Sequence, residues 1–152
     1  MAVDIDGVIS LFGFEERPEL TRIQLVDGIP HCISLPAGER LLRLSERFEL
    51  VWASGWEDKA NFYLPELLGL PELPHISFDV AARSGGAHWK LTGMEAYAAE
   101  RAIAWIDDNF DDSCYEWAER REAPTLLVPT EPHLGLEEAQ VAALEDWALS
   151  LS

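Results

Sequence analysis

The sequence predicts an α/β fold in which a five-stranded parallel sheet lies between helices on both of its faces. Short apolar segments rich in β-branched and aromatic residues alternate with longer amphipathic segments, and this alternation is typical of βαβ units. The 152 residues are enough for one domain that buries its own core, and no linker or repeat divides them. We therefore expect a single three-layer domain over residues 1–152.

The expected elements follow one another in a regular order. Five segments have the composition of buried strands: Ala2–Ile5, Phe48–Ala53, His75–Phe78, Ala102–Ile106 and Pro124–Val128. Five others carry apolar residues at helical spacing: Gly38–Arg47, Glu57–Leu68, Lys90–Glu100, Asp112–Glu122 and Glu137–Leu149. In the first helix, for example, Leu41 and Leu44 fall on the side opposite Arg43.

The stretch after the first strand has a different pattern. Thr21–Val26 and Ile29–Leu35 flank the dipeptide Asp27-Gly28, and a two-residue Asp-Gly link between such runs predicts a tight β-hairpin. Pro30 has no N–H to donate to a sheet, which places it at an edge. We expect this hairpin, at about residues 14–36, to project as a flap over the ends of the strands.

Composition excludes several classes of partner. The formal net charge of −17 would repel the phosphate backbone of a long nucleic acid. No apolar stretch approaches the ~18–20 residues that cross a bilayer, and Met1–Asp6 does not resemble an export signal, so we expect no membrane partner and a cytoplasmic protein. The two cysteines and four histidines lack metal-ligand spacing, so the sequence does not predict a zinc site.

Polar residues stand where three of the predicted strands end. Asp4 and Asp6 follow the first strand, Ser54 follows the second, and the pair Asp107-Asp108 follows the fourth. The carboxyl ends of parallel strands line one crevice, which is where such folds bind ligands. We therefore expect these side chains to converge at one edge of the sheet.

Four converging carboxylates repel one another unless a cation lies between them. Mg²⁺ prefers oxygen ligands and fits a site rich in Asp better than zinc does. Lys90, at the start of a predicted helix, can add a positive charge, and Arg83 is the nearest alternative for that role. A phosphate group would complete the site, with Ser54 and nearby backbone N–H groups binding its oxygens and Asp4 free to attack phosphorus.

These residues resemble the four signatures of the haloacid dehalogenase-like (HAD) superfamily. The first is Asp4-Ile5-Asp6-Gly7-Val8, the second is the strand that ends at Ser54, the third is Lys90, and the fourth is Asp107-Asp108. The resemblance spans most of the chain and implies a Rossmann-like three-layer fold. It also implies that the chain is a phosphohydrolase that requires Mg²⁺.

The same resemblance implies roles for individual residues. Asp4 would be the nucleophile that forms an aspartyl-phosphate, and Asp6 would protonate the leaving oxygen and later activate water. Ser54, Gly55 and Lys90 would bind the phosphate group. Asp4, the backbone carbonyl of Asp6, Asp107 directly and Asp108 through water would hold the metal, although Asp111 and Asp112 leave the last assignment open.

No large insertion interrupts the hairpin region or the segment between Ser54 and Lys90. In this respect the chain resembles the capless members of the superfamily, in which larger substrates can reach the site. A narrower resemblance is to small bacterial HAD domains grouped with RNA-repair proteins, and it is carried by Trp52–Glu57, Leu67–Pro71 and Trp105–Asp108. The implied substrate is a phosphorylated small molecule or a nucleotide end. Two alternatives are a non-catalytic protein that binds a phosphorylated ligand or partner, and a phosphotransferase acting on a nucleotide or RNA end.

Some of these residues also have purely structural interpretations. Ser54 is a preferred N-cap residue and could cap the helix that begins near Glu57. Asp111 and Asp112 could place favourable negative charge at the start of the next helix, and this is the role we expect for both.

Overall fold

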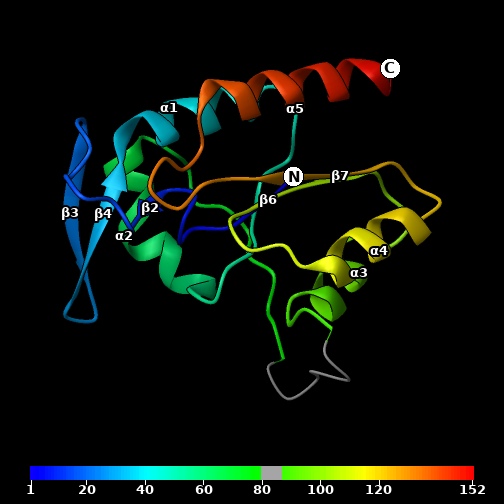
Figure 1. Ribbon diagram of the computed structural model, residues 1–152, viewed down its shortest axis with the longest axis horizontal. Coiled ribbons are helices and arrows are strands. Elements are labelled where there is room, and N and C mark those ends of the chain that lie inside the picture. The colour runs from blue at the N-terminus through cyan, green and yellow to red at the C-terminus, as the bar shows by residue number, and fades with distance from the viewer. Residues whose placement is uncertain (80–86) are drawn as a thin grey trace.

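A four-stranded parallel sheet forms the centre of the protein. The computed structural model describes residues 1–79 and 87–152 (Figure 1). The strands lie in the order β5-β1-β6-β7 and comprise β5 (Val51–Trp52), β1 (Ala2–Val3), β6 (Ile103–Asp107) and β7 (Thr125–Pro129). The predicted α/β class and the parallel arrangement are confirmed.

Helices cover both faces of this sheet. They are α1 (Leu35–Leu44), the short 3₁₀ helix η1 (Glu57–Lys59), α2 (Ala60–Leu68), α3 (Leu91–Ala98), α4 (Asp112–Arg120) and α5 (Glu138–Ser150). Alternate strand residues point to opposite faces: Val3 and Ile106 share a buried apolar cluster with α1, α2 and α5, whereas Ala2 and Trp105 share another with α3 and α4. Figure 1 shows the resulting layers, with α1 and α5 on one side of β6 and β7 and with α3 and α4 on the other.

The fifth strand predicted at His75–Phe78 is reduced to a single bridge. His75 pairs with Trp52 of β5, through hydrogen bonds from the Trp52 N–H to the Pro74 carbonyl and from the Ile76 N–H to the Trp52 carbonyl. Pro74 has no N–H to donate, so the pairing does not extend toward the N-terminus. The prediction of a five-stranded sheet was therefore wrong by this one element.

The predicted hairpin is confirmed and belongs to a small antiparallel sheet, which we call the flap. β3 (Thr21–Val26) and β4 (Ile29–Ser34) pair along their length, and both turn residues have positive φ, 51° at Asp27 and 81° at Gly28. Such a turn matches the twist of the strands it joins. A third strand, β2 (Ser10–Leu11), pairs with β4 and was not predicted. The flap lies beyond the carboxyl ends of the central strands, at the left of Figure 1.

Several helix boundaries differ from the predicted ones because of capping residues. The first helix was predicted over Gly38–Arg47 but begins at Leu35, since the Ser34 hydroxyl accepts a hydrogen bond from the Ala37 N–H and Pro36 suits a first turn. Lys90 is the N-cap of α3 and so stands just before the helix. Its side chain is therefore free to turn toward the ends of the strands.

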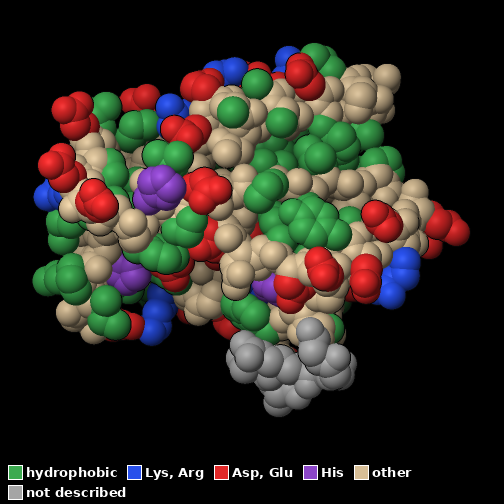
Figure 2. Space-filling view, in the orientation of Figure 1, with side chains coloured by type: hydrophobic (Ala, Val, Ile, Leu, Met, Phe, Trp, Pro, Cys, Tyr) green, Lys and Arg blue, Asp and Glu red, His purple; other side chains and the backbone are tan. Residues whose placement is uncertain are grey.

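Acidic side chains outnumber basic ones, with 28 Asp and Glu against 11 Lys and Arg. Figure 2 shows Asp and Glu side chains spread over one face, with Lys and Arg mostly toward its margins. Among the described residues, no helix has both the length and the apolar character needed to cross a membrane.

Asp111→Ala should destabilise the protein by about 1 kcal/mol at pH 7, the usual cost of losing an N-cap. Asp111 caps α4 by accepting hydrogen bonds from the Cys114 N–H at 3.2 Å and from the Ser113 hydroxyl. The bond from Ser113 holds the pKa of Asp111 below its ordinary value. The stabilisation is therefore complete above that ordinary value and declines as the pH falls through the pKa of the folded protein.

Urea unfolding of the wild type and the variant at pH 7 and in mild acid measures this effect. Asp112→Ala is the matched control, since Asp112 is exposed, lies one residue further on and is not the N-cap. Equal stability losses in the two variants would contradict the capping role.

Candidate active site

The register of the central sheet places two aspartates side by side. Val3 of β1 pairs with Ile106 of β6, so Asp4 and Asp107 occupy the next, adjacent positions. The Asp4 N–H donates to the Ile106 carbonyl at 3.0 Å, which fixes this register at the strand end. Because side chains alternate between faces, Asp4 and Asp107 point to the side of the sheet that α3 and α4 cover. Both are buried, with 5% and 1% of their surface exposed.

Lys90 joins these two carboxylates. Its Nζ lies 3.0 Å from Asp4 Oδ1 and 2.6 Å from Asp107 Oδ2, and the lysine itself is only 3% exposed. Burial lowers the pKa of Lys90, but the charges of Asp4 and Asp107 outweigh it and raise that pKa overall. Lys90 is therefore a permanent cation between two buried acids.

A second set of hydrogen bonds holds Asp107 and Lys90 in place. Trp105, on the same face of β6, donates its Nε1–H to Asp107 Oδ2 at 3.2 Å, and the Asn109 N–H donates to Oδ1 at 3.0 Å. The buried His88 ring accepts the Lys90 N–H at Nδ1 and contacts the Asn109 carbonyl through Nε2 at 2.9 Å. The loop before α3 is thus tied to the loop after β6.

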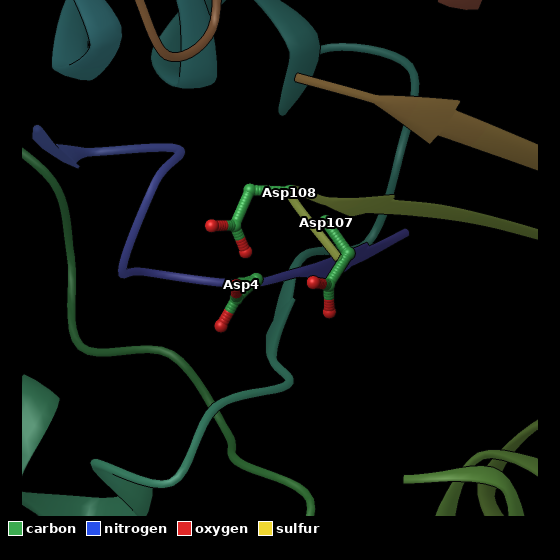
Figure 3. A group of neighbouring side chains, drawn as sticks. All are labelled: Asp4, Asp107 and Asp108. Carbon is green, nitrogen blue, oxygen red and sulfur yellow. The ribbon is translucent and has the colours of Figure 1, made fainter. Parts of the chain in front are cut away.

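Asp108 completes a group of three carboxylates, drawn in Figure 3. Oxygens of Asp4, Asp107 and Asp108 lie within 4.8 Å of one another, and the figure shows Asp108 reaching from the end of β6 toward Asp4 at the end of β1. Gly7 makes room for it, because a Cβ atom at that position would overlap with the Asp108 carboxylate. The Thr130 hydroxyl donates to the Gly7 carbonyl at 2.8 Å and holds this turn against β7.

The electrostatics of this group favour a bound cation. Burial raises the pKa of Asp4 well above its ordinary value, with Lys90 opposing the rise and Asp107 adding to it. Burial and the charge of Asp107 also raise the pKa of Asp108. Three ionised carboxylates against one ammonium leave two negative charges, which a divalent ion would balance.

Ser54 and Gly55 follow β5, next to β1. The Ala53 N–H donates to the Val3 carbonyl, so Ala53 lies level with Asp4, and Ser54 comes one residue later, two residues beyond the end of β5. The buried Ser54 hydroxyl accepts the Trp56 N–H at 3.2 Å, which closes the turn that leads into η1. Gly55 is exposed and lies beside the ring of Trp89, the neighbour of Lys90.

Asp6 does not belong to the group of three carboxylates. It is exposed, and its Oδ2 accepts a hydrogen bond from Trp56 Nε1 at 3.2 Å. Its Oδ1 lies 3.6 Å from Nδ1 of His31, a residue of the flap strand β4. Asp6 therefore faces the flap, whereas Asp4 faces Lys90.

The structure thus brings Asp4, Lys90, Asp107 and Asp108 into one cluster. Ser54 and Gly55 follow the adjacent strand β5, and Asp111 lies at the start of α4, as predicted, where it is also the N-cap. Arg83, the alternative to Lys90, lies outside the described residues. Sequence reasoning missed His88 and His31, because His88 also contacts the Asn109 carbonyl and His31 lies beside Asp6, and both of these neighbours are far away along the chain. It also missed the Trp105 indole, although Trp105 precedes Asp107 by two residues, a spacing that places both side chains on one face of a strand.

Compared with known proteins, the chain matches no family model, no curated protein and no solved structure.

Lys90→Met should destabilise the protein by roughly 3–5 kcal/mol, because it leaves two buried carboxylates without their counter-charge. Chemical denaturation at neutral pH measures the loss. Lys59→Met is the matched control, since Lys59 also pairs with an aspartate, Asp27, but on the exposed surface. Similar stabilities for the two variants would show that the buried cluster does not form as described.

Gly7→Ala should abolish any stabilisation of the protein by Mg²⁺, because the new methyl group displaces Asp108. Gly13→Ala is the control: both glycines have positive φ, 81° and 76°, but a Cβ at Gly13 meets no atom within 4 Å. Each variant bears the cost of a left-handed alanine, about 1 kcal/mol. Thermal unfolding with and without MgCl₂ measures the difference, and an unchanged Mg²⁺ response in Gly7→Ala would contradict the role of Asp108.

Proposed function

We propose that the protein is a Mg²⁺-dependent phosphatase that hydrolyses a phosphomonoester through an aspartyl-phosphate on Asp4, as the resemblance to the HAD superfamily implies. The observation that carries this proposal is the position of Asp4. Its carboxylate is buried at a strand end, 3.0 Å from the Lys90 ammonium and beside two further carboxylates. A fixed carboxylate next to a cation suits nucleophilic attack on an anionic phosphate group.

The carboxylate group fits magnesium, which binds hard oxygen ligands. Asp4, Asp107 and Asp108 would hold the ion, and the backbone carbonyl of Asp6 is a further ligand by resemblance to the superfamily. When bound, Mg²⁺ neutralises charge on the phosphate oxygens.

Lys90 and the turn after β5 would bind the phosphate group. The Lys90 ammonium has three N–H donors, and its two carboxylate contacts leave one of them for a phosphate oxygen. Backbone N–H groups near Gly55 and the Ser54 hydroxyl would contact the other oxygens. This side of the site therefore orients the phosphate and balances its charge.

In the first step, an Asp4 carboxylate oxygen attacks phosphorus, and the bond from phosphorus to the ester oxygen breaks. The Asp6 carboxyl gives its proton to that oxygen, so the leaving group departs as a neutral alcohol. Asp4 then carries the phosphoryl group as a mixed anhydride, and Asp6 is a carboxylate.

In the second step, water attacks the phosphorus atom of the aspartyl-phosphate and gives a proton to the Asp6 carboxylate. The bond from phosphorus to the Asp4 oxygen breaks and inorganic phosphate is released. Asp4 returns to its carboxylate form and Asp6 to its acid form, so both residues are ready for another turnover.

The proposed substrate is a phosphorylated small molecule or a nucleotide end. The flap is the described element that screens the carboxyl edge, which supports access for a substrate larger than a simple metabolite. The acidic surface opposes a long polyanion, but a single terminal phosphate makes few charge contacts. Transfer of the phosphoryl group to an acceptor other than water is the alternative outcome of the second step, and analysis of the products distinguishes it.

Asp4→Asn should lower Mg²⁺-dependent turnover of an aryl phosphate by a factor of roughly 10⁴, because an amide cannot form the phosphoenzyme. Release of p-nitrophenol from its phosphate ester measures the rate, and removal of Mg²⁺ with a chelator should abolish it. Asp112→Asn, which changes an exposed aspartate of α4, should leave the rate unchanged. A wild type that binds phosphate but turns over no phosphoester would favour the non-catalytic alternative.

A further inference from the structure

A second polar group lies between the flap and the turn after β5. Asp6 is its centre: Oδ2 accepts from Trp56 Nε1 at 3.2 Å, and Oδ1 lies 3.6 Å from His31 Nδ1. The same His31 nitrogen is 2.9 Å from the Ser10 hydroxyl oxygen. The His31 and Trp56 rings meet edge to face with their centres 4.8 Å apart.

We propose that His31, together with Trp56, is a positioning residue that orients the Asp6 carboxyl for proton exchange with the leaving group. This inference rests on the proposed function. His31 acts on Asp6 and not on the substrate itself. The flap would therefore contribute to the chemistry as well as cover the site.

Because Asp6 is exposed, its carboxyl needs neighbouring side chains to hold it in one orientation. Its side chain is 51% exposed, and a carboxyl this open to water samples several rotamers. An acid that protonates a leaving oxygen must instead be held within hydrogen-bond reach of it. Trp56 already bonds to one carboxyl oxygen, and a contact from His31 to the other oxygen would restrict rotation far more than Trp56 does alone.

Both partners are themselves held in place. Trp56 is 9% exposed, and its backbone N–H donates to the Ser54 hydroxyl, so the indole is anchored to the turn that ends β5. The His31 side chain is 19% exposed, and β4 pairs with strands on both sides of it. The neighbouring Ser10 is 3% exposed. Asp6 is thus oriented by side chains that have little freedom of their own.

The flap is fastened to the rest of the protein near this group. Asp27, in the flap turn, pairs with Lys59 of η1 at 2.5 Å, and η1 directly follows Trp56. The distance of 3.6 Å between His31 and Asp6 exceeds a hydrogen bond, and closing it takes a shift of less than about 1 Å. Such contacts commonly shorten when a substrate binds.

Proton donation matters most when the leaving group is a strong base, and this gives a specific test. His31→Leu should lower kcat for phenyl phosphate by roughly 10–100-fold, because a displaced acid loses most of its effect. The loss with p-nitrophenyl phosphate should be several-fold smaller, since p-nitrophenolate leaves without a proton. KM should change little for either ester, because the phosphate contacts are intact.

Two further variants separate positioning from folding. His31→Asn places an amide N–H near the position of Nδ1 and should restore most of kcat. Trp56→Phe keeps an aromatic ring without the donor, so it should reproduce the dependence on the leaving group. Gln24→Leu is the control. Gln24 pairs with His31 across the flap but hydrogen-bonds to the Leu25 carbonyl, and its loss should leave both rates unchanged.

The possible results are distinct. Equal losses with both esters, or no recovery in His31→Asn when that variant unfolds at the wild-type temperature, would overturn the positioning role. If the wild type is active, Asp4→Asn is inactive and His31→Leu equals the wild type, this inference fails while the proposed function stands. A wild type with no phosphoester turnover would overturn both.

Discussion

The site depends on one buried interaction, the Lys90 ammonium between the Asp4 and Asp107 carboxylates. Parallel pairing of β1 with β6 puts two acids next to each other at the end of the sheet, where they are removed from water and repel. Lys90 offsets the repulsion between these two carboxylates only because α3 lies on the face to which both acids point. A buried ion pair of this kind adds little net stability, since desolvation offsets the attraction. In the proposed reaction, its value lies in holding the Asp4 carboxylate in position to attack phosphorus.

The site has two parts with different physical character. The buried part, around Asp4, is held by strand register, by the Lys90 ammonium and by the hydrogen bonds of His88, all of which form with the core. The second part, around Asp6, is half exposed and depends on how the flap meets the turn after β5. In the proposed reaction, the buried part binds and accepts the phosphoryl group, and the half-exposed part exchanges a proton with the leaving group. Variation in the flap could thus alter the preferred substrate without disturbing the nucleophile.

Local sequence patterns predicted the parts of the fold that local chemistry determines. Asp27-Gly28 can form a turn in which both residues have positive φ, and the hairpin was confirmed. The helix predicted from Gly38 begins three residues earlier, at Leu35, because Ser34 caps it. The predicted strand at His75 is only a bridge because a strand can form no more ladder hydrogen bonds than the neighbouring strand allows. That neighbour is β5, which has only two residues.

For the site, the rule that strand ends converge grouped Asp4 and Asp107 in advance, and Lys90 was added because it opens the predicted helix before the fourth strand. It could not find His88 or His31, because each contacts residues about 20 positions away through a register that only the folded chain defines. It also did not separate Asp6 from the other acids. Two residues after Asp4, the chain has left β1 and is entering the turn at Gly7, so alternation no longer dictates where the Asp6 side chain points.

The charge of the protein makes the dependence on a cation a physical requirement of the proposed function. At physiological ionic strength, charges more than about 8 Å from the site are largely screened, so the total of −17 matters less to a small anion than the groups around Asp4. Those groups sum to −2 when ionised, from three carboxylates and one ammonium. A phosphate dianion would meet net repulsion there, and Lys90 alone cannot reverse it. A divalent cation brings the local sum to zero, which lets Lys90 and the backbone N–H groups near Gly55 attract the phosphate oxygens.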